Sequence, residues 1–134
     1  MDMMPFGPLT HVAVTVRDLA VSVPWYRALF GTEPVLDEDT DGGFRHAVFA
    51  LGTGTLFGLH QHAKTAPAER FSEYNVGLDH VAFGCADRDE LEERARHLEG
   101  LGITHGGVVD AHYGSGVSFR DPDGIALEFF APPA

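Results

Sequence analysis

Two histidines stand at matching places in two similar stretches of the chain. The segments Leu9–Val16 and Leu78–Cys85 read LTHVAVTV and LDHVAFGC, so His11 and His80 are each followed by Val-Ala. Strict alternation predicts a strand in both, with the histidine and the alanine on one face and larger apolar residues on the other. A lone strand histidine is usually structural. A histidine that recurs at the same place, in a chain with eight histidines, raises the question of metal binding.

An acidic residue interrupts the last apolar run of the chain. Within Ile125–Phe130, which reads IALEFF, Glu128 shares its strand face with Ala126 and Phe130. A carboxylate in such a strand is costly unless it is paired or neutralised. The two interpretations are an ion pair with Arg120 or another arginine, and a bound metal ion. The metal gains support because both repeated histidines also lie beside alanines on one strand face.

The elements that position these residues also occur twice. A helical pattern follows each histidine strand. The first helix is expected to begin near Asp18 or Ser22, with Pro24 in its first turn, and to end at Gly31. The second is expected to run from Asp87 to Gly102. Three strands then follow in each half, near residues 33–39, 44–51 and 55–62, and near 103–109, 116–120 and 125–130. Residues 114–116, which read GSG, are expected to form a loop. The offset of about 70 residues predicts two βαβββ modules and an α+β fold.

The charge and the amino-acid composition exclude some classes of protein. The 134 residues carry a formal charge of −11 with Lys64 as the only lysine, which disfavours nucleic acid as a partner. Cys85 is the only cysteine, and its apolar strand face fits a buried thiol in the reducing cytoplasm. Residues 1–5 show no signal-peptide pattern, and no run of 18 apolar residues is present to span a membrane. A single cytoplasmic domain is therefore expected.

Taken together, these motifs resemble the vicinal oxygen chelate (VOC) superfamily, which includes glyoxalase I, bleomycin- and fosfomycin-resistance proteins, methylmalonyl-CoA epimerase and extradiol dioxygenases. The resemblance rests on the two His-Val-Ala strands, the Trp25-Tyr26 helix ending at Gly31, and Phe119–Gly124 followed by Leu127-Glu128. It implies one domain over residues 1–134 whose mixed β-sheet forms a cup. Its boundaries are module one at about 9–62, a connection at about 63–77, and module two at about 78–131. It also implies a homodimer.

The resemblance further implies a metal site. Metal-binding members take ligands from the first strand of each module and from the last strand of the second, which correspond here to His11, His80 and Glu128. Two imidazoles and a carboxylate leave positions open on a divalent ion, whether Zn, Fe, Ni, Mn or Co, for a substrate that chelates through adjacent oxygens. The expected substrate contacts are Ala13, Ala82, Tyr113 and Phe130. Tyr113 and its neighbour His112 are also candidates for an acid–base group, although a plain loop is the favoured interpretation.

The chain departs from the family pattern at a fourth position. Glyoxalase I carries a Glu or Gln ligand in the last strand of module one, where the internal repeat aligns Gly58 with Glu128. Glycine has no side chain to ligate a metal. His60 shares the face of Gly58 and can replace it as a ligand if the strand register slides by two residues. Otherwise His60 belongs to a polar strand end.

Two functions remain open on these residues. One is a divalent-metal-dependent enzyme that acts on a small oxygen-chelating organic substrate by lyase, isomerase or dioxygenase chemistry. The other is a protein similar to the bleomycin-resistance branch, which sequesters a small molecule without chemistry and is favoured by Gly58 and by the small residues of the same face. The acidic charge predicts a neutral or modestly polar ligand in preference to a polyphosphate or a CoA ester.

Overall fold

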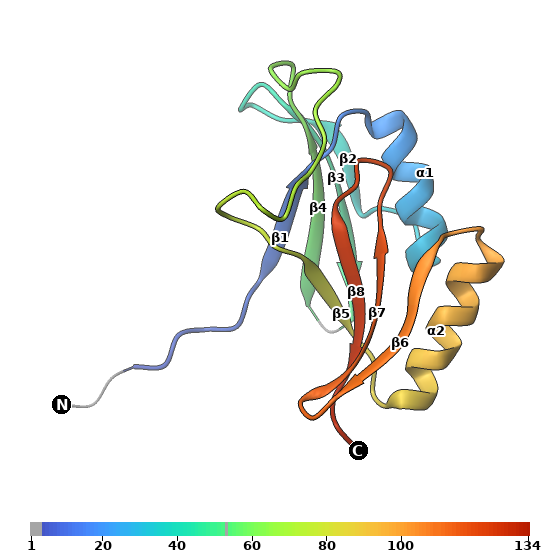
Figure 1. The fold of residues 1–134 in the computed structure, drawn as a ribbon. Helices are drawn as coiled ribbons and strands as arrows, with labels where there is room; N and C mark the ends of the chain where they lie inside the picture. Colours follow the sequence, from blue (N-terminus) through green and yellow to red (C-terminus); the bar gives the residue numbers. More distant parts are fainter. Residues whose placement is uncertain (1–3, 53) are drawn as a thin grey trace. The chain divides into compact units, whose positions relative to one another are not determined.

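The predicted βαβββ repeat is present in the protein. The computed structural model describes residues 4–52 and 54–134, so the N-terminal segment expected to lack a signal peptide lies partly outside that range. The elements, labelled in Figure 1, are β1 (His11–Thr15), α1 (Leu19–Phe30), β2 (Leu36–Asp39), β3 (Arg45–Leu51), β4 (Thr55–Gln61), β5 (Val81–Gly84), α2 (Arg88–Gly100), β6 (His105–Ala111), β7 (Gly114–Arg120) and β8 (Ala126–Ala131). The α+β fold class is confirmed.

The chain divides into two compact units, Met1–Pro67 and Ala68–Ala134, and each contains one four-stranded sheet and one helix. The strand order is β1-β4-β3-β2 in the first unit and β5-β8-β7-β6 in the second. In both, the first strand runs parallel to the last strand, and the remaining neighbours are antiparallel. The two units therefore share one topology.

The core of the first unit lies between α1 and the sheet. Tyr26 is fully buried, and its ring centroid lies 5.3 Å from that of Phe57 and 6.5 Å from that of Phe49. The Asp18 side chain caps the helix by accepting a hydrogen bond from the backbone N–H of Ala20. The helix thus begins early enough to place Pro24 inside it, and the expected position of Pro24 in the first turn is wrong.

The second unit packs α2 against its sheet in the predicted manner. Asp87 caps the helix by accepting a hydrogen bond from the backbone N–H of Glu90 at 2.8 Å. Leu91 and Leu98 are fully buried, and α2 contacts β6, β7 and β8 (Figure 1). Cys85 is buried as expected, and burial raises the pKa of its thiol. Among the described residues, no helix has the length and apolar character needed to cross a membrane.

The hairpin between β6 and β7 differs from the expected loop. Ala111 pairs with Gly114, so only His112 and Tyr113 connect the strands, and residues 114–116 belong to β7. A strand that begins Gly-Ser-Gly has no apolar alternation to reveal it. Gly114 has a φ of +144°, and a Cβ built there would lie 2.3 Å from Cζ of Phe130. The absence of a side chain at Gly114 therefore lets the Phe130 ring pack against the hairpin.

Candidate metal and substrate site

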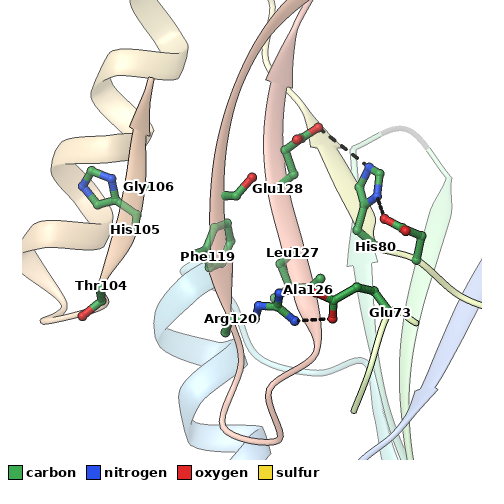
Figure 2. A pocket seen from close by; sticks show the side chains of 12 residues that line it. Glu73, His80, Thr104, His105, Gly106, Phe119, Arg120, Ala126, Leu127 and Glu128 are labelled. Atoms are coloured by element: carbon green, nitrogen blue, oxygen red, sulfur yellow. Dashed lines mark hydrogen bonds and ion pairs between the residues drawn. The ribbon is translucent and has the colours of Figure 1, made fainter. Parts of the chain in front are cut away.

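The second unit brings together two of the three predicted metal ligands. His80 directly precedes β5, and Glu128 lies in β8, where it pairs with Ala82 of β5. His80 Nε2 lies 4.0 Å from Glu128 Oε1, and a dashed line marks this contact in Figure 2. This spacing exceeds a hydrogen bond of about 2.7–3.2 Å and is somewhat wider than the roughly 3.3–3.6 Å that separates two donors on one tetrahedral zinc with bonds of about 2.0–2.2 Å.

Asp79 holds the other side of the His80 ring. His80 Nδ1 lies 2.7 Å from Asp79 Oδ1, and because a carboxylate only accepts, this contact requires the hydrogen on Nδ1. In the neutral imidazole the lone pair is then on Nε2, which lies on the Glu128 side. Carboxylate–histidine pairs of this kind orient many metal-ligating imidazoles. Sequence reasoning assigned no role to Asp79, although its place directly before the repeated histidine was visible.

Glu128 is not part of the ion pair that was the alternative to a metal. Arg120 instead makes a bidentate ion pair with Glu73, with nitrogen–oxygen distances of 2.9 and 3.0 Å (Figure 2). The hydrogen bonds from Arg120 lower the pKa of Glu73 to about 2. The Glu128 side chain is 23% exposed, and a Cβ built on Gly116 would lie 3.1 Å from its carboxylate. Glycine at position 116 therefore leaves room for Glu128.

Two cavities flank Glu128, and His80, Ser118 and Glu128 line both. The first has a volume of about 610 Å³ and a charged rim that includes Asp79, His105 and the Glu73–Arg120 pair. His105 has both ring nitrogens engaged, Nε2 at 3.1 Å from a Glu99 oxygen and Nδ1 at 3.0 Å from the backbone N of Gly107. It is therefore a structural residue of this rim.

The second cavity, of about 500 Å³, is more apolar. Its lining includes three of the four predicted substrate contacts, Ala82, Tyr113 and Phe130. The Tyr113 and Phe130 rings are nearly parallel, with centroids 6.3 Å apart and planes inclined by 14°. Val109 and Tyr113 are both 65% exposed. This cavity can accept an uncharged, apolar part of a ligand beside the His80–Glu128 pair.

The remaining predicted site residues, His11, Ala13 and His60, lie in the first unit. Ala13 pairs with Gly58 just as Ala82 pairs with Glu128. The register therefore does not slide by two residues, and Gly58 occupies the place that corresponds to Glu128. His11 Nδ1 lies 2.9 Å from Thr10 Oγ1, so the preceding residue contacts Nδ1 in both repeated histidines.

His60 belongs to a cluster of aromatic and histidine rings in the first unit. Its ring stacks on Phe44 with centroids 4.5 Å apart, and its centroid lies 5.9 Å from that of His46 and 6.0 Å from that of His62. Burial lowers the pKa of His60, and the charges of neighbouring histidines lower it further. His46 Nε2 is buried and lacks a hydrogen-bond partner among the described residues, although it lies 3.7 Å from Glu38 Oε1.

The donor groups suit a divalent transition metal. Within residues 4–52 and 54–134, no three His, Cys, Asp or Glu side chains form a ready metal cluster. The second unit nonetheless supplies an imidazole and a carboxylate, and the first unit supplies imidazoles, which are donors that Zn, Fe, Ni and Co accept. Because the preceding residue contacts Nδ1 of both His11 and His80, Nε2 is the nitrogen of each ring that a metal ion would use.

The sequence of this chain is similar to those of known proteins. A sequence model described as the Glyoxalase/Bleomycin resistance protein/Dioxygenase superfamily matches residues 9–129. An ethylmalonyl-CoA/methylmalonyl-CoA epimerase of Cereibacter sphaeroides is 30% identical over 103 residues, which cover 72% of this chain and 77% of the relative.

Solved structures agree with the sequence matches. A glyoxylase/bleomycin resistance protein/dioxygenase domain from Frankia sp. EAN1pec has a TM-score of 0.85 and 27% identity, over 96% of this chain and 99% of that one. A lactoylglutathione lyase from Agrobacterium tumefaciens has a TM-score of 0.72 and 25% identity, over 96% of each chain.

Proposed function

This chain belongs to the glyoxalase/bleomycin resistance protein/dioxygenase superfamily, and within that family we propose that it is a divalent-metal-dependent enzyme acting on a small organic molecule that chelates through two oxygens. The proposed metal ligands are His11, His80 and Glu128. The observation that carries the proposal is the His80–Glu128 pair, in which Asp79 holds Nδ1 and leaves Nε2 free toward the carboxylate.

The side chains around the pair have distinct tasks in this proposal. When bound, a divalent ion withdraws electrons from a chelated carbonyl and so acidifies the neighbouring C–H bond. Asp79 orients His80, and Gly116 leaves space for Glu128. Tyr113 and Phe130 bind the apolar part of the substrate and exclude water from it.

The reaction class follows from the relatives. One relative is named as an epimerase and one structure as a lyase, and both names support lyase or isomerase chemistry over dioxygenase chemistry for this chain. For a substrate that chelates through a carbonyl, lyase or isomerase chemistry would move a proton on the carbon atom next to that carbonyl group. The catalytic acid or base of such a step is not assigned to a residue.

The charge of the first cavity supports a neutral substrate. Glu73, Asp79 and Glu128 line it with one arginine, Arg120, which is neutralised by Glu73. A bound divalent ion would offset Asp79 and Glu128 but would leave no excess of positive charge there to attract an anionic group. We therefore propose a substrate without phosphate groups, in contrast to the CoA ester in the name of the epimerase.

Solvent proton exchange tests the proposal. Hydroxyacetone is neutral and presents two adjacent oxygens, so the zinc- or cobalt-loaded protein in D₂O is expected to accelerate deuterium incorporation beside its carbonyl, followed by NMR. Glu128→Ala removes a ligand and should abolish the acceleration. Glu93→Ala removes an exposed carboxylate of α2 that is neither a proposed ligand nor part of either cavity lining, and it serves as the matched control.

Two other results would each favour a different function. Tight binding of small apolar molecules with no metal requirement would favour the sequestering protein, which the apolar second cavity supports. Oxygen consumption with catechols would favour a dioxygenase. Turnover of an acyl-CoA ester would contradict the proposed neutral substrate.

Assembly and location complete the proposal. We propose a homodimer, on the basis of the family resemblance, and a cytoplasmic location, on the basis of the single buried cysteine. Light scattering of the purified protein tests the first, and fractionation of the source cells tests the second.

A further inference from the structure

An arginine faces the first cavity with its hydrogen-bonding positions already filled. Arg120 lines this cavity together with His80 and Glu128. The Arg120 fork, meaning Nη1 and Nη2, donates to the two carboxylate oxygens of Glu73 at 3.0 and 2.9 Å (Figure 2). Proteins use the same bidentate arrangement to recognise the carboxylate and phosphate groups of ligands. Glu73 therefore occupies the place that an anionic substrate group would take.

The surrounding backbone holds Arg120 independently of Glu73. Nη1 of Arg120 also donates to the carbonyl oxygen of Gly124 at 3.0 Å. Gly124 belongs to a turn in which the Asp121 carboxylate accepts a hydrogen bond from the backbone N–H of Asp123 at 2.9 Å. The guanidinium is half exposed, so a ligand in the cavity can reach it. Arg120 is thus expected to stay in the cavity wall when the Glu73 side chain is removed.

The segment that carries Glu73 has its own contact with this turn. The backbone N–H of Phe71 donates to the carbonyl oxygen of Asp123 at 3.2 Å, which keeps the segment beside the turn without the ion pair. The hydrogen bonds from Arg120 lower the pKa of Glu73 to about 2. Glu73 is therefore a charged carboxylate at neutral pH, and the fork is filled under the conditions in which the protein works.

The other carboxylates of the cavity have different neighbours. Asp79 lies 2.7 Å from Nδ1 of His80, and Glu128 lies 4.0 Å from Nε2 of the same ring. Both are directed to the imidazole, so neither is positioned to replace Glu73 in the fork. Removal of the Glu73 side chain should leave a guanidinium with two parallel N–H donors open to the cavity.

We propose that Glu73 makes the site selective for neutral substrates, because its carboxylate fills the Arg120 fork that would otherwise bind an anionic substrate group. This inference rests on the proposed function, since it assigns to one residue the preference for a neutral substrate in the same cavity. Glu73 is a specificity-determining residue in this account and takes no part in metal binding or in chemistry. Its loss should turn the fork into a binding site for carboxylates.

A titration of the metal-free, full-length protein with benzoate and benzamide tests this assignment. The two probes have nearly the same shape, but only benzoate carries a charge. The wild type should show no preference for benzoate, whereas Glu73→Ala should bind benzoate more tightly than benzamide by about tenfold or more. The Nε–H signal of Arg120 in the ¹H–¹⁵N NMR spectrum should move only in the variant. Glu73→Gln keeps the side-chain shape and should change the preference in the same direction, so the test stands even if Glu73→Ala does not fold.

Two further variants distinguish the opened fork from any loss of an acidic residue. Glu73→Ala combined with Arg120→Gln should lose the preference for benzoate, because the donors are gone. Asp110→Ala is the matched control, since Asp110 accepts from Nε and Nη2 of Arg88 at 3.0 and 3.1 Å and neither residue lines a cavity described above. It should gain no preference.

The outcomes for Glu73 and for the proposed function are separable. Equal binding of the two probes by folded Glu73→Ala, or by Glu73→Gln, would contradict the specificity role, and this result does not depend on metal. In the zinc-loaded protein, benzoate should inhibit hydroxyacetone exchange by Glu73→Ala at about tenfold lower concentration than in the wild type. If the wild type catalyses no exchange, the proposed function fails, while the metal-free titration still decides whether Glu73 keeps anions from the fork.

Discussion

At the scale of single residues, two carboxylates act on one imidazole in different ways. Asp79 lies within hydrogen-bond distance of Nδ1, whereas Glu128 stands 4.0 Å from Nε2, too far for a hydrogen bond. The first contact fixes the ring, and the second leaves a gap between two potential metal donors. The site therefore depends on Asp79 even though this residue is not a proposed ligand.

Removing Asp79 should weaken metal binding without removing a ligand. Asp79→Ala is expected to lower Zn²⁺ affinity by about 10–100-fold, the usual effect of losing an outer partner. Asp79→Asn should lose less, because its amide oxygen can still accept from Nδ1. Competition titration measures the affinity, and ¹⁵N NMR of the metal-free protein should show hydrogen on Nδ1 of His80 in the wild type. Unchanged affinity in Asp79→Ala would show that the contact has no role.

Some residues of the site were predictable and others were not. His80 and Glu128 could be identified because each stands out in a regular strand pattern, and that pattern is local in sequence. The Glu73–Arg120 ion pair joins residues 47 positions apart, so only the folded chain brings them together. The same holds for the ring of Phe44, whose contact with His60 depends on the register of two strands.

At the scale of secondary-structure elements, the fold could be predicted because the sequence contains an internal repeat. Helix ends were marked by Asp18, Asp87 and the glycines that follow each helix, because caps and left-handed stops have strong residue preferences. The start of β7 was not predictable, since Gly114 and Gly116 weaken the alternation on which strand prediction relies. Those glycines leave room for the side chains of Phe130 and Glu128.

Pro24 should limit the stability of α1. It lies inside the helix, where its ring clashes with the carbonyl of residue 20 and its missing N–H removes one helical hydrogen bond. Pro24→Ala is expected to raise the free energy of unfolding by about 1–2 kcal/mol, which is less than the full helix-interior penalty because alanine makes the unfolded chain more flexible. Urea denaturation measures this change, and a lower stability of Pro24→Ala would contradict it.

At the scale of the whole molecule, acid should destabilise the fold through identified ion pairs. Arg120 lowers the pKa of Glu73 from 4.5 to about 2, and Arg88 and Ser115 lower that of Asp110 from 3.8 to about 2. Because the folded state lowers both pKa values, their contribution is complete above about pH 4.5 and is lost as pH falls toward 2. Urea denaturation should show stability falling across this window.

Arg120→Gln isolates one of these contributions. It removes the partner of Glu73 and leaves the Arg88–Asp110 pair intact, so the loss of stability between pH 4.5 and 2 should become shallower. An identical pH dependence in the wild type and the variant would show that Glu73 does not contribute through Arg120. Both residues are partly exposed, so salt should also reduce the effect.

Metal analysis of protein purified without chelators tests the proposed metal site most directly. The wild type and the Glu93→Ala control should each bind about one divalent ion per chain, since both keep every proposed ligand. Glu128→Ala should bind none after the same preparation and after dialysis against Zn²⁺, while circular dichroism shows that it remains folded. If Glu128→Ala retains about one tightly bound ion per chain, the assignment of Glu128, and with it the proposed metal site, is contradicted.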